Sequence, residues 1–306
     1  MTTRSMALGS LAALAAGSLL TGPTLAQTPQ KIADIEYARV GDQSLKLDLY
    51  QPAAARAPLL VWLHGGRWER GSKERMPLAA LVERGYALAS LDFRPASTAR
   101  FPAQVHDVKA ALRFLRAQST RYGYDATRIG ILGESSGGHL AALVGTTNGH
   151  RELEGALGEY LGTSSDVHAI VSYFGAANLL TILAQSTPYG IDVRTPALKS
   201  LLGALPEENE ALARLASPVF HVDAGDPPLL LLHGDQDPQM PINQSHELEG
   251  VYERLGLDAR LIVVHGAGHG GSVFFDRDRT ALVAAFLDEH LRPNLGSEPS
   301  AAVTRP

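Results

Sequence analysis

The sequence predicts an α/β protein with an about eight-stranded, mostly parallel sheet, helices on both faces and a small helical cap insertion. Apolar runs of strand length alternate with helical patterns, and the middle runs are continuously apolar, as in strands that are buried on both faces. The 306 residues are 45% hydrophobic and 19% charged, which supplies a large core and excludes a disordered or fibrous chain.

Eight apolar runs are expected to form the strands, and amphipathic stretches between them are expected to form helices. The expected strands are residues 35–40, 45–50, 59–63, 87–92, 129–132, 169–174, 229–233 and 260–265. The expected helices are residues 77–84, 105–122, 139–144, 244–255 and 280–291.

Residues 179–226 depart from this alternation, because they carry helical pieces at 198–202 and 207–215 but no clear strand. We expect a cap inserted into a single domain that spans residues 27–292. The polar, Pro-rich residues 293–306 are expected to form a disordered tail.

The first residues have the pattern of a secretory signal. Arg4 supplies the positive charge, residues 6–20 form a short Ala/Leu/Gly run, and small residues precede a cleavage site after Ala26. The run is too short to span a bilayer, and the alternatives are a disordered Ala-rich tail or a buried helix. We expect residues 1–26 to be a signal peptide and the mature protein to be secreted or periplasmic, without membrane association.

Charge and cysteine content exclude several functions. A net charge of -5 with scattered Lys and Arg gives no basic surface for nucleic acid. The absence of cysteine removes disulfides, thiolate catalysis and Cys-ligated zinc. No histidine pair has metal-site spacing, so neither a metal nor another cofactor is expected. The oligomeric state is left open.

The clearest motif is Gly133-Glu134-Ser135-Ser136-Gly137, which joins an expected strand to an expected helix. G-x-S-x-G in this context predicts a sharp turn that holds a serine hydroxyl above the sheet, while the glycines avoid collisions with neighbouring backbone. Ser135 is the predicted nucleophile. Ser136 is the alternative, but only Ser135 has glycine at both -2 and +2, and the structural alternative is a Gly/Ser loop that caps the helix.

A serine nucleophile needs a base, and the base needs an orienting acid. His269 lies in a glycine-rich loop beyond the last expected strand and is the predicted base. Asp235 and Asp237 both follow the preceding strand. Asp237 is predicted to orient His269, because Asp235, next to a glycine, suits a structural turn.

The third expected strand ends in His64-Gly65-Gly66-Arg67-Trp68. Small residues at this point let backbone N–H groups approach a developing oxyanion. The predicted oxyanion hole consists of the N–H groups of Gly66 and Gly65 with that of Ser136 at the start of the following helix. Arg67 and Trp68 are expected at the mouth of the site, where they would bind the substrate. A tight strand-exit turn is the alternative.

With these motifs the chain resembles the α/β-hydrolases, and among them the esterase/lipase branch with an HGG oxyanion motif, especially acetyl/feruloyl-esterase-like proteins and carboxylesterases. The matching stretches are 64–66, 92–94, 101–103, 107, 133–140, 217–218, 228–237 and 268–270. The resemblance implies that Ser135, His269 and Asp237 form a triad with Gly66 and Ser136 as oxyanion hole. Arg67 departs from the third glycine of the fuller HGGG pattern, and Ser136 replaces the usual small residue.

We therefore expect a serine esterase that cleaves short-chain or small aromatic carboxylic esters of sugars or other polar alcohols through an acyl-enzyme. Its partner would be a small-molecule or polysaccharide ester. Export, a polar cap and the lack of a long apolar stretch for an acyl tunnel favour this substrate class. The alternatives are an arylformamidase-like amidase and a prolyl-oligopeptidase-like peptidase. A non-catalytic binding protein would require a missing triad member.

Overall fold

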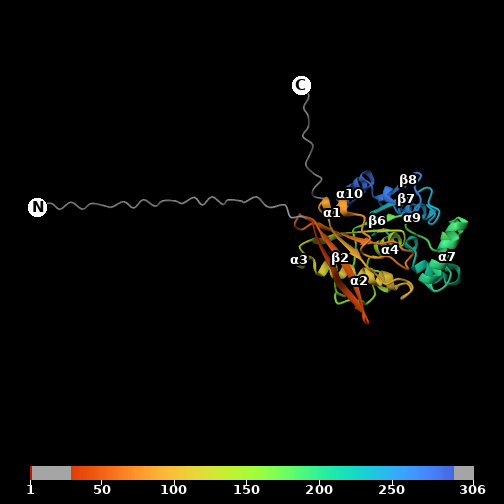
Figure 1. Cartoon of the computed structure of the whole chain (residues 1–306), viewed down its shortest axis with the longest axis horizontal. Helices are drawn as coiled ribbons and strands as arrows, with labels where there is room; N and C mark the ends of the chain where they lie inside the picture. Colours follow the sequence, from red (N-terminus) through yellow and green to blue (C-terminus); the bar gives the residue numbers. More distant parts are fainter. Residues whose placement is uncertain (2–28, 293–306) are drawn as a thin grey trace, which may run out of the picture.

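The strands of the protein form one eight-stranded sheet with helices around it (Figure 1). The computed structural model describes Met1 and residues 29–292. Apart from Met1, the expected signal peptide lies outside the described residues, and so does the expected C-terminal tail. Among the residues that are described, no helix is long and apolar enough to cross a membrane.

All eight expected strands are present. They are β1 (Gln30–Val40), β2 (Gln43–Gln51), β3 (Pro58–Leu63), β4 (Ala87–Leu91), β5 (Asp125–Glu134), β6 (Ala169–Tyr173), β7 (Leu229–Gly234) and β8 (Ala259–Val264). Their order in the sheet is β1-β2-β4-β3-β5-β6-β7-β8. The β1–β2 and β2–β4 pairs are antiparallel, and the remaining pairs are parallel. β4, β6 and β7 are buried along their whole length, which explains their continuous apolar runs.

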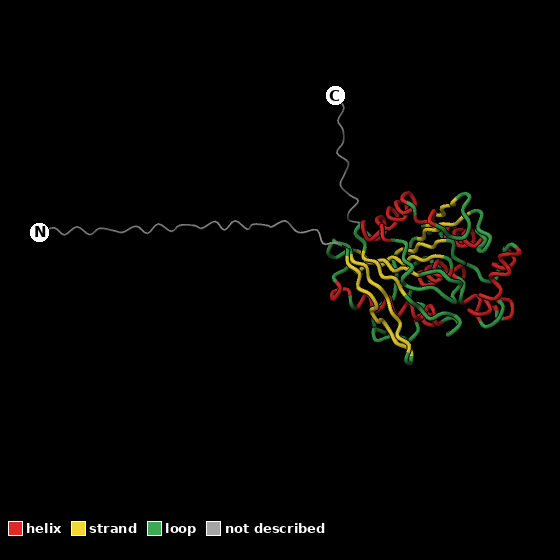
Figure 2. Tube along the Cα trace, in the orientation of Figure 1, coloured by secondary structure: helices red, strands yellow, loops and turns green. Residues whose placement is uncertain are grey.

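Helices cover both faces of the sheet, as Figure 2 shows. The helices outside the β6–β7 segment are α1 (Ala79–Glu83), α2 (Ala103–Ala117), α3 (Ser119–Tyr122), α4 (Ser136–Gly145), α5 (Arg151–Glu154), α9 (Asn243–Arg254) and α10 (Arg277–Leu291). α1 and α10 share one apolar cluster with one face of the strands, and α2, α4 and α9 share a second cluster on the opposite face. The sheet is therefore the middle layer of three.

The helix expected at residues 105–122 divides into α2 and α3 at Gln118. The hydroxyl of Tyr124 donates to the carbonyl oxygen of Leu115 at 2.6 Å. In a continuous helix that carbonyl would accept from the amide of Ser119. This tertiary contact therefore accompanies the interruption, and periodicity alone could not reveal it.

A helical segment without a strand lies between β6 and β7, in agreement with the expected cap. It contains α6 (Ile182–Gln185), α7 (Pro188–Leu202) and α8 (Glu210–Leu215) with short 3-10 turns at Pro206–Glu208 and Pro218–Phe220. α7 begins well before the expected piece at 198–202: Thr187 caps it by accepting from the Gly190 amide at 3.0 Å, and Pro188 suits the first turn. An internal proline and a glycine weaken its sequence signal. In Figure 1, α7 lies at the periphery of the molecule.

Candidate active site

The chain passes from β5 into α4 through the single residue Ser135. Ser135 has φ +52° and ψ -118°, a strained conformation for an L-residue. Two glycines allow it: a Cβ on Gly133 would lie 2.2 Å from the Gly137 carbonyl oxygen, and one on Gly137 would lie 2.1 Å from a carbonyl oxygen of β3. The Ser135 amide donates to the Tyr173 carbonyl at 2.8 Å, which ties the turn to β6.

Ser135, His269 and Asp237 are brought together at the carboxyl ends of β5, β8 and β7. Ser135 Oγ lies 2.8 Å from His269 Nε2, and His269 Nδ1 lies 2.6 Å from Asp237 Oδ2. Asp237 Oδ1 accepts from the amides of Gln239 and Met240 at 2.8 and 2.9 Å, and the Asp237 side chain is fully buried. Serine, imidazole and carboxylate thus form a continuous hydrogen-bonded chain.

Electrostatics favour the ionised form of Asp237. Burial opposes ionisation, but hydrogen bonds from His233, His269 and the Met240 amide outweigh it and hold the pKa of Asp237 well below its usual range. An imidazolium formed at His269 would therefore meet a negative charge.

Asp235 lies elsewhere. Its carboxylate accepts from the Gly266 amide at 2.7 Å and contacts Nδ1 of the exposed His265 at 2.8 Å. Asp235 thus joins the loops that follow β7 and β8, and Asp237 is the aspartate that reaches His269.

The predicted oxyanion donor Gly65 lies beside Glu134: burial raises the pKa of the Glu134 carboxyl, and the Gly65 backbone opposes this shift. Gly65, Gly66 and Ser136 thus all remain candidate donors. Gly66 has φ +133°, and a Cβ there would lie 1.9 Å from the Arg70 carbonyl oxygen, so only glycine fits this turn.

The prediction that Trp68 binds substrate at the mouth of the site is wrong. Trp68 is fully buried, and its indole N–H donates to His139 Nδ1 at 3.0 Å. His139 Nε2 in turn donates to the Ala216 carbonyl in the cap segment at 2.7 Å. The cause is local: Arg67 and Trp68 have φ +60° and +62°, and the indole is directed into the core, away from solvent. Arg67, in contrast, lines the active-site pocket as expected.

The pocket at Ser135 and His269 has a volume of about 200 Å³. Besides these two residues and the loop glycines, it is lined by Arg67, Arg70, Arg75, Glu134, Phe174 and Gln239. Phe174 contacts the His269 ring edge-on, with the ring centroids 5.0 Å apart. Phe174, Gln239, Arg70 and Arg75 were missed in the sequence because no motif marks them; only Glu134 stands inside one.

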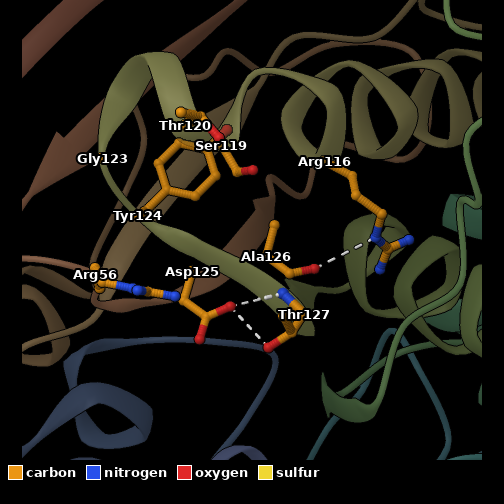
Figure 3. Close-up of a pocket in the computed structure, with 9 residues that line it drawn as sticks. All are labelled: Arg56, Arg116, Ser119, Thr120, Gly123, Tyr124, Asp125, Ala126 and Thr127. Carbon is orange, nitrogen blue, oxygen red and sulfur yellow. Dashed lines mark hydrogen bonds between the residues drawn. The ribbon is translucent and has the colours of Figure 1, made fainter.

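A larger hollow, of about 740 Å³, lies at the other end of β5 (Figure 3). It contains none of the triad residues. Its polar side chains serve the structure: Arg116 Nε donates to the Ala126 carbonyl at 3.3 Å, and the Asp125 carboxylate accepts from the amide and hydroxyl of Thr127. Size alone therefore does not mark this hollow as a reaction site.

Asp258, Glu289 and His290 are the one group of three potential metal ligands found in residues 29–292. Arg260 pairs with both carboxylates at 2.9 Å, so the group already has its counter-charge.

The sheet order, the strained serine turn after β5 and the chain order Ser–Asp–His define an α/β-hydrolase. Residues 47–252 match the model of the BD-FAE family, and the chain belongs to this family.

Relatives and solved structures agree with this assignment. Esterase LipC of Mycobacterium tuberculosis (strain ATCC 25618 / H37Rv) is 31% identical over 244 residues, which are 76% of this chain and 58% of LipC. The chain thus spans little more than half of that relative. A truncated carbohydrate esterase from gut microbiota has a TM-score of 0.78 and 33% identity, covering 88% of this chain and 99% of that one. Propionate-bound esterase Est2 of Thermogutta terrifontis has a TM-score of 0.69 and 25% identity, covering 87% and 96%.

Proposed function

We propose that the protein is a serine carboxylic ester hydrolase. The observation that carries the proposal is the hydrogen-bonded chain from Ser135 through His269 to Asp237, with distances of 2.8 and 2.6 Å. The relative and the two structural neighbours named above are esterases, which supports the reaction type.

The proposed reaction assigns one step to each of these residues. Ser135 Oγ attacks the ester carbonyl carbon while His269 Nε2 takes the hydroxyl proton, and Asp237 stabilises the imidazolium. The carbonyl oxygen becomes an oxyanion, to which the amides of Gly66 and Ser136 donate. When the C–O bond breaks, His269 returns the proton to the departing alcohol and an acyl-enzyme remains. Water then attacks the acyl carbon by the same route, which releases the free acid and regenerates the Ser135 hydroxyl.

The proposed substrates are esters of short-chain or small aromatic acids with sugars or other polar alcohols. A pocket of about 200 Å³ lies below the usual range of roughly 300–1,000 Å³ for ligand sites, which favours a small acyl group. The charged lining suits a polar alcohol, and the carbohydrate esterase among the structural neighbours supports a sugar. The signal pattern in residues 1–26 supports export, to where polymeric esters are found.

The decisive experiment compares Ser135→Ala with the wild type on p-nitrophenyl esters from acetate to palmitate. We expect hydrolysis of short esters, and its loss in the variant with no change in thermal midpoint, because the Ser135 hydroxyl supports no core packing. Ser119→Ala, in the distant hollow of Figure 3, is the matched control and should retain activity.

Two results would contradict the proposal. Faster cleavage of an aryl-formamide than of any ester would indicate an amidase, and faster cleavage of a Gly-Pro anilide would indicate a peptidase. A kcat/KM that rises beyond octanoate would replace the short-chain assignment by a lipase.

A further inference from the structure

Positive charge exceeds negative charge around the active-site pocket. Arg67, Arg70 and Arg75 line it, with Glu134 as the only acid among the lining residues. Arg75 Nε pairs with Glu134 at 3.0 Å, whereas Arg67 Nε has only a loose contact with Glu69 at 3.8 Å. Arg70 makes no salt bridge within residues 29–292. Arg67 and Arg70 therefore present charge that the protein does not fully neutralise.

A fourth guanidinium approaches from behind the pocket wall. Arg194 of α7 is fully buried, and its Nε donates at 3.0 Å to the carbonyl oxygen of Gln239, which lines the pocket. In the described part of the chain, neither Nη1 nor Nη2 of Arg194 has a hydrogen-bond partner. Burial lowers the pKa of Arg194 to about 10; Asp237 opposes this shift, and Arg67 adds to it. Buried donors without partners are costly, so the described residues do not fully compensate the guanidinium of Arg194.

We propose that the natural ester carries a carboxylate close to the scissile bond, that Arg67 and Arg70 bind it, and that the buried charge of Arg194 stabilises it from behind Gln239. This inference rests on the proposed esterase function and narrows its substrate class. Arg67 and Arg70 line the pocket and would contact the carboxylate directly, whereas Arg194 is not among the lining residues and would act through its charge alone. A guanidinium offers a planar pair of donors that matches a carboxylate, and a bound anion would relieve the repulsion between Arg67 and Arg194.

Two isosteric substrate pairs test the proposal. In the first pair, methyl hydrogen succinate carries a carboxylate on the acyl side and methyl succinamate carries an amide there. In the second pair, acetoxyacetate carries a carboxylate on the alcohol side and acetoxyacetamide carries an amide there. We expect kcat/KM to favour the anionic member of at least one pair about tenfold or more, since each charge-assisted contact is worth roughly this factor. The pair that shows this preference indicates whether the carboxylate of the natural ester lies in its acyl part or in its alcohol part.

Variants assign the preference to the arginines. Arg70→Gln and Arg67→Gln should each lower the anionic-to-neutral ratio about tenfold. Arg84→Gln, on the exposed end of α1, is the control and should leave the ratio unchanged. The anionic-to-neutral ratio of kcat/KM does not depend on the amount of folded enzyme, so even a partly unfolded variant gives a valid measurement of the substrate preference.

Arg194→Met separates a binding role from a structural one. Because it removes a buried charge with unpartnered nitrogens, we expect the ratio to fall while the thermal midpoint stays the same or rises. A lower midpoint with an unchanged ratio would remove Arg194 from the proposal.

If the wild type cleaves the neutral and anionic members of both pairs equally, the proposed carboxylate is wrong, but the proposed esterase activity is unaffected. If it cleaves no ester in a Ser135-dependent manner, the esterase itself is wrong.

Discussion

Acidification is expected to destabilise the folded protein through His139. This residue is fully buried on α4 between Trp68 and the Ala216 carbonyl, and burial lowers its pKa to about 4. In the unfolded chain the pKa of a histidine is about 6.5. The unfolded state therefore binds the proton first, so the contribution of His139 is complete above about pH 6.5 and is lost as the pH falls toward 4.

The magnitude follows from the difference of about 2.5 pKa units. At about 1.36 kcal/mol per unit, His139 contributes about 3 kcal/mol across this window. Asp226 acts in the opposite direction over an overlapping range, because burial raises its pKa to about 7 and its protonation stabilises the folded state as the pH falls. The pH profile of the wild type alone is therefore a sum that does not isolate His139.

A comparison of the wild type with a His139 variant isolates the contribution of His139. Urea unfolding of the wild type and His139→Gln between pH 4 and 7 gives the stability difference at each pH, and contributions common to both proteins cancel. We expect the advantage of the wild type to shrink by about 3 kcal/mol from pH 7 to pH 4. A difference that stays constant with pH would show that His139 is not a buried neutral imidazole, and would refute the reasoning.

Three further predictions concern the proposed catalytic site and the loop that holds it. Asp237→Asn should lower kcat about 10⁴-fold, whereas Asp235→Asn, which affects a contact with the exposed His265, should change it only a few fold; the reverse ranking would exchange the two roles. Gly137→Ala would place a Cβ 2.1 Å from the Leu63 carbonyl oxygen and should abolish activity, whereas Gly162→Ala, with no neighbour within 4 Å, should be silent; equal behaviour in the assay would contradict the packing argument. Trp68→Phe removes the donor to His139 and should cost about 1–3 kcal/mol in urea unfolding, with KM for aryl and alkyl esters changed alike; a selective rise for aryl esters would restore Trp68 as a substrate contact.

The fold was predictable because its signals are local. A parallel strand with both faces buried must be apolar at every position, and β4, β6 and β7 show this directly in the sequence. The positions of Ser135, His269 and Asp237 were predictable for a related reason, since each follows a strand whose carboxyl end lies at one edge of the sheet.

The remainder of the site depends on contacts between distant segments. No pattern in α7 indicates that Arg194 is buried against the loop that carries Gln239, because polar residues on a cap helix are expected at the surface. The close approach of Gly65 to Glu134 likewise requires knowledge of how the loop after β3 meets the end of β5. Such contacts between distant segments leave no short-range pattern, whereas the buried strands do.

The loop after β3 gives the buried Trp68 a role in holding the candidate active site. Gly66, Arg67 and Trp68 all have positive φ, and for the two non-glycine residues this costs about 1–2 kcal/mol each. Burial of a tryptophan removes about 150–250 Å² from water and contributes roughly 4–6 kcal/mol at about 25 cal/mol per Å². Because this exceeds the strain, the indole of Trp68 anchors the loop in a conformation that the backbone alone would avoid. Gly66 lies two residues before Trp68 in the same loop, so an anchored Trp68 would also restrain Gly66, the proposed oxyanion donor, without touching the substrate.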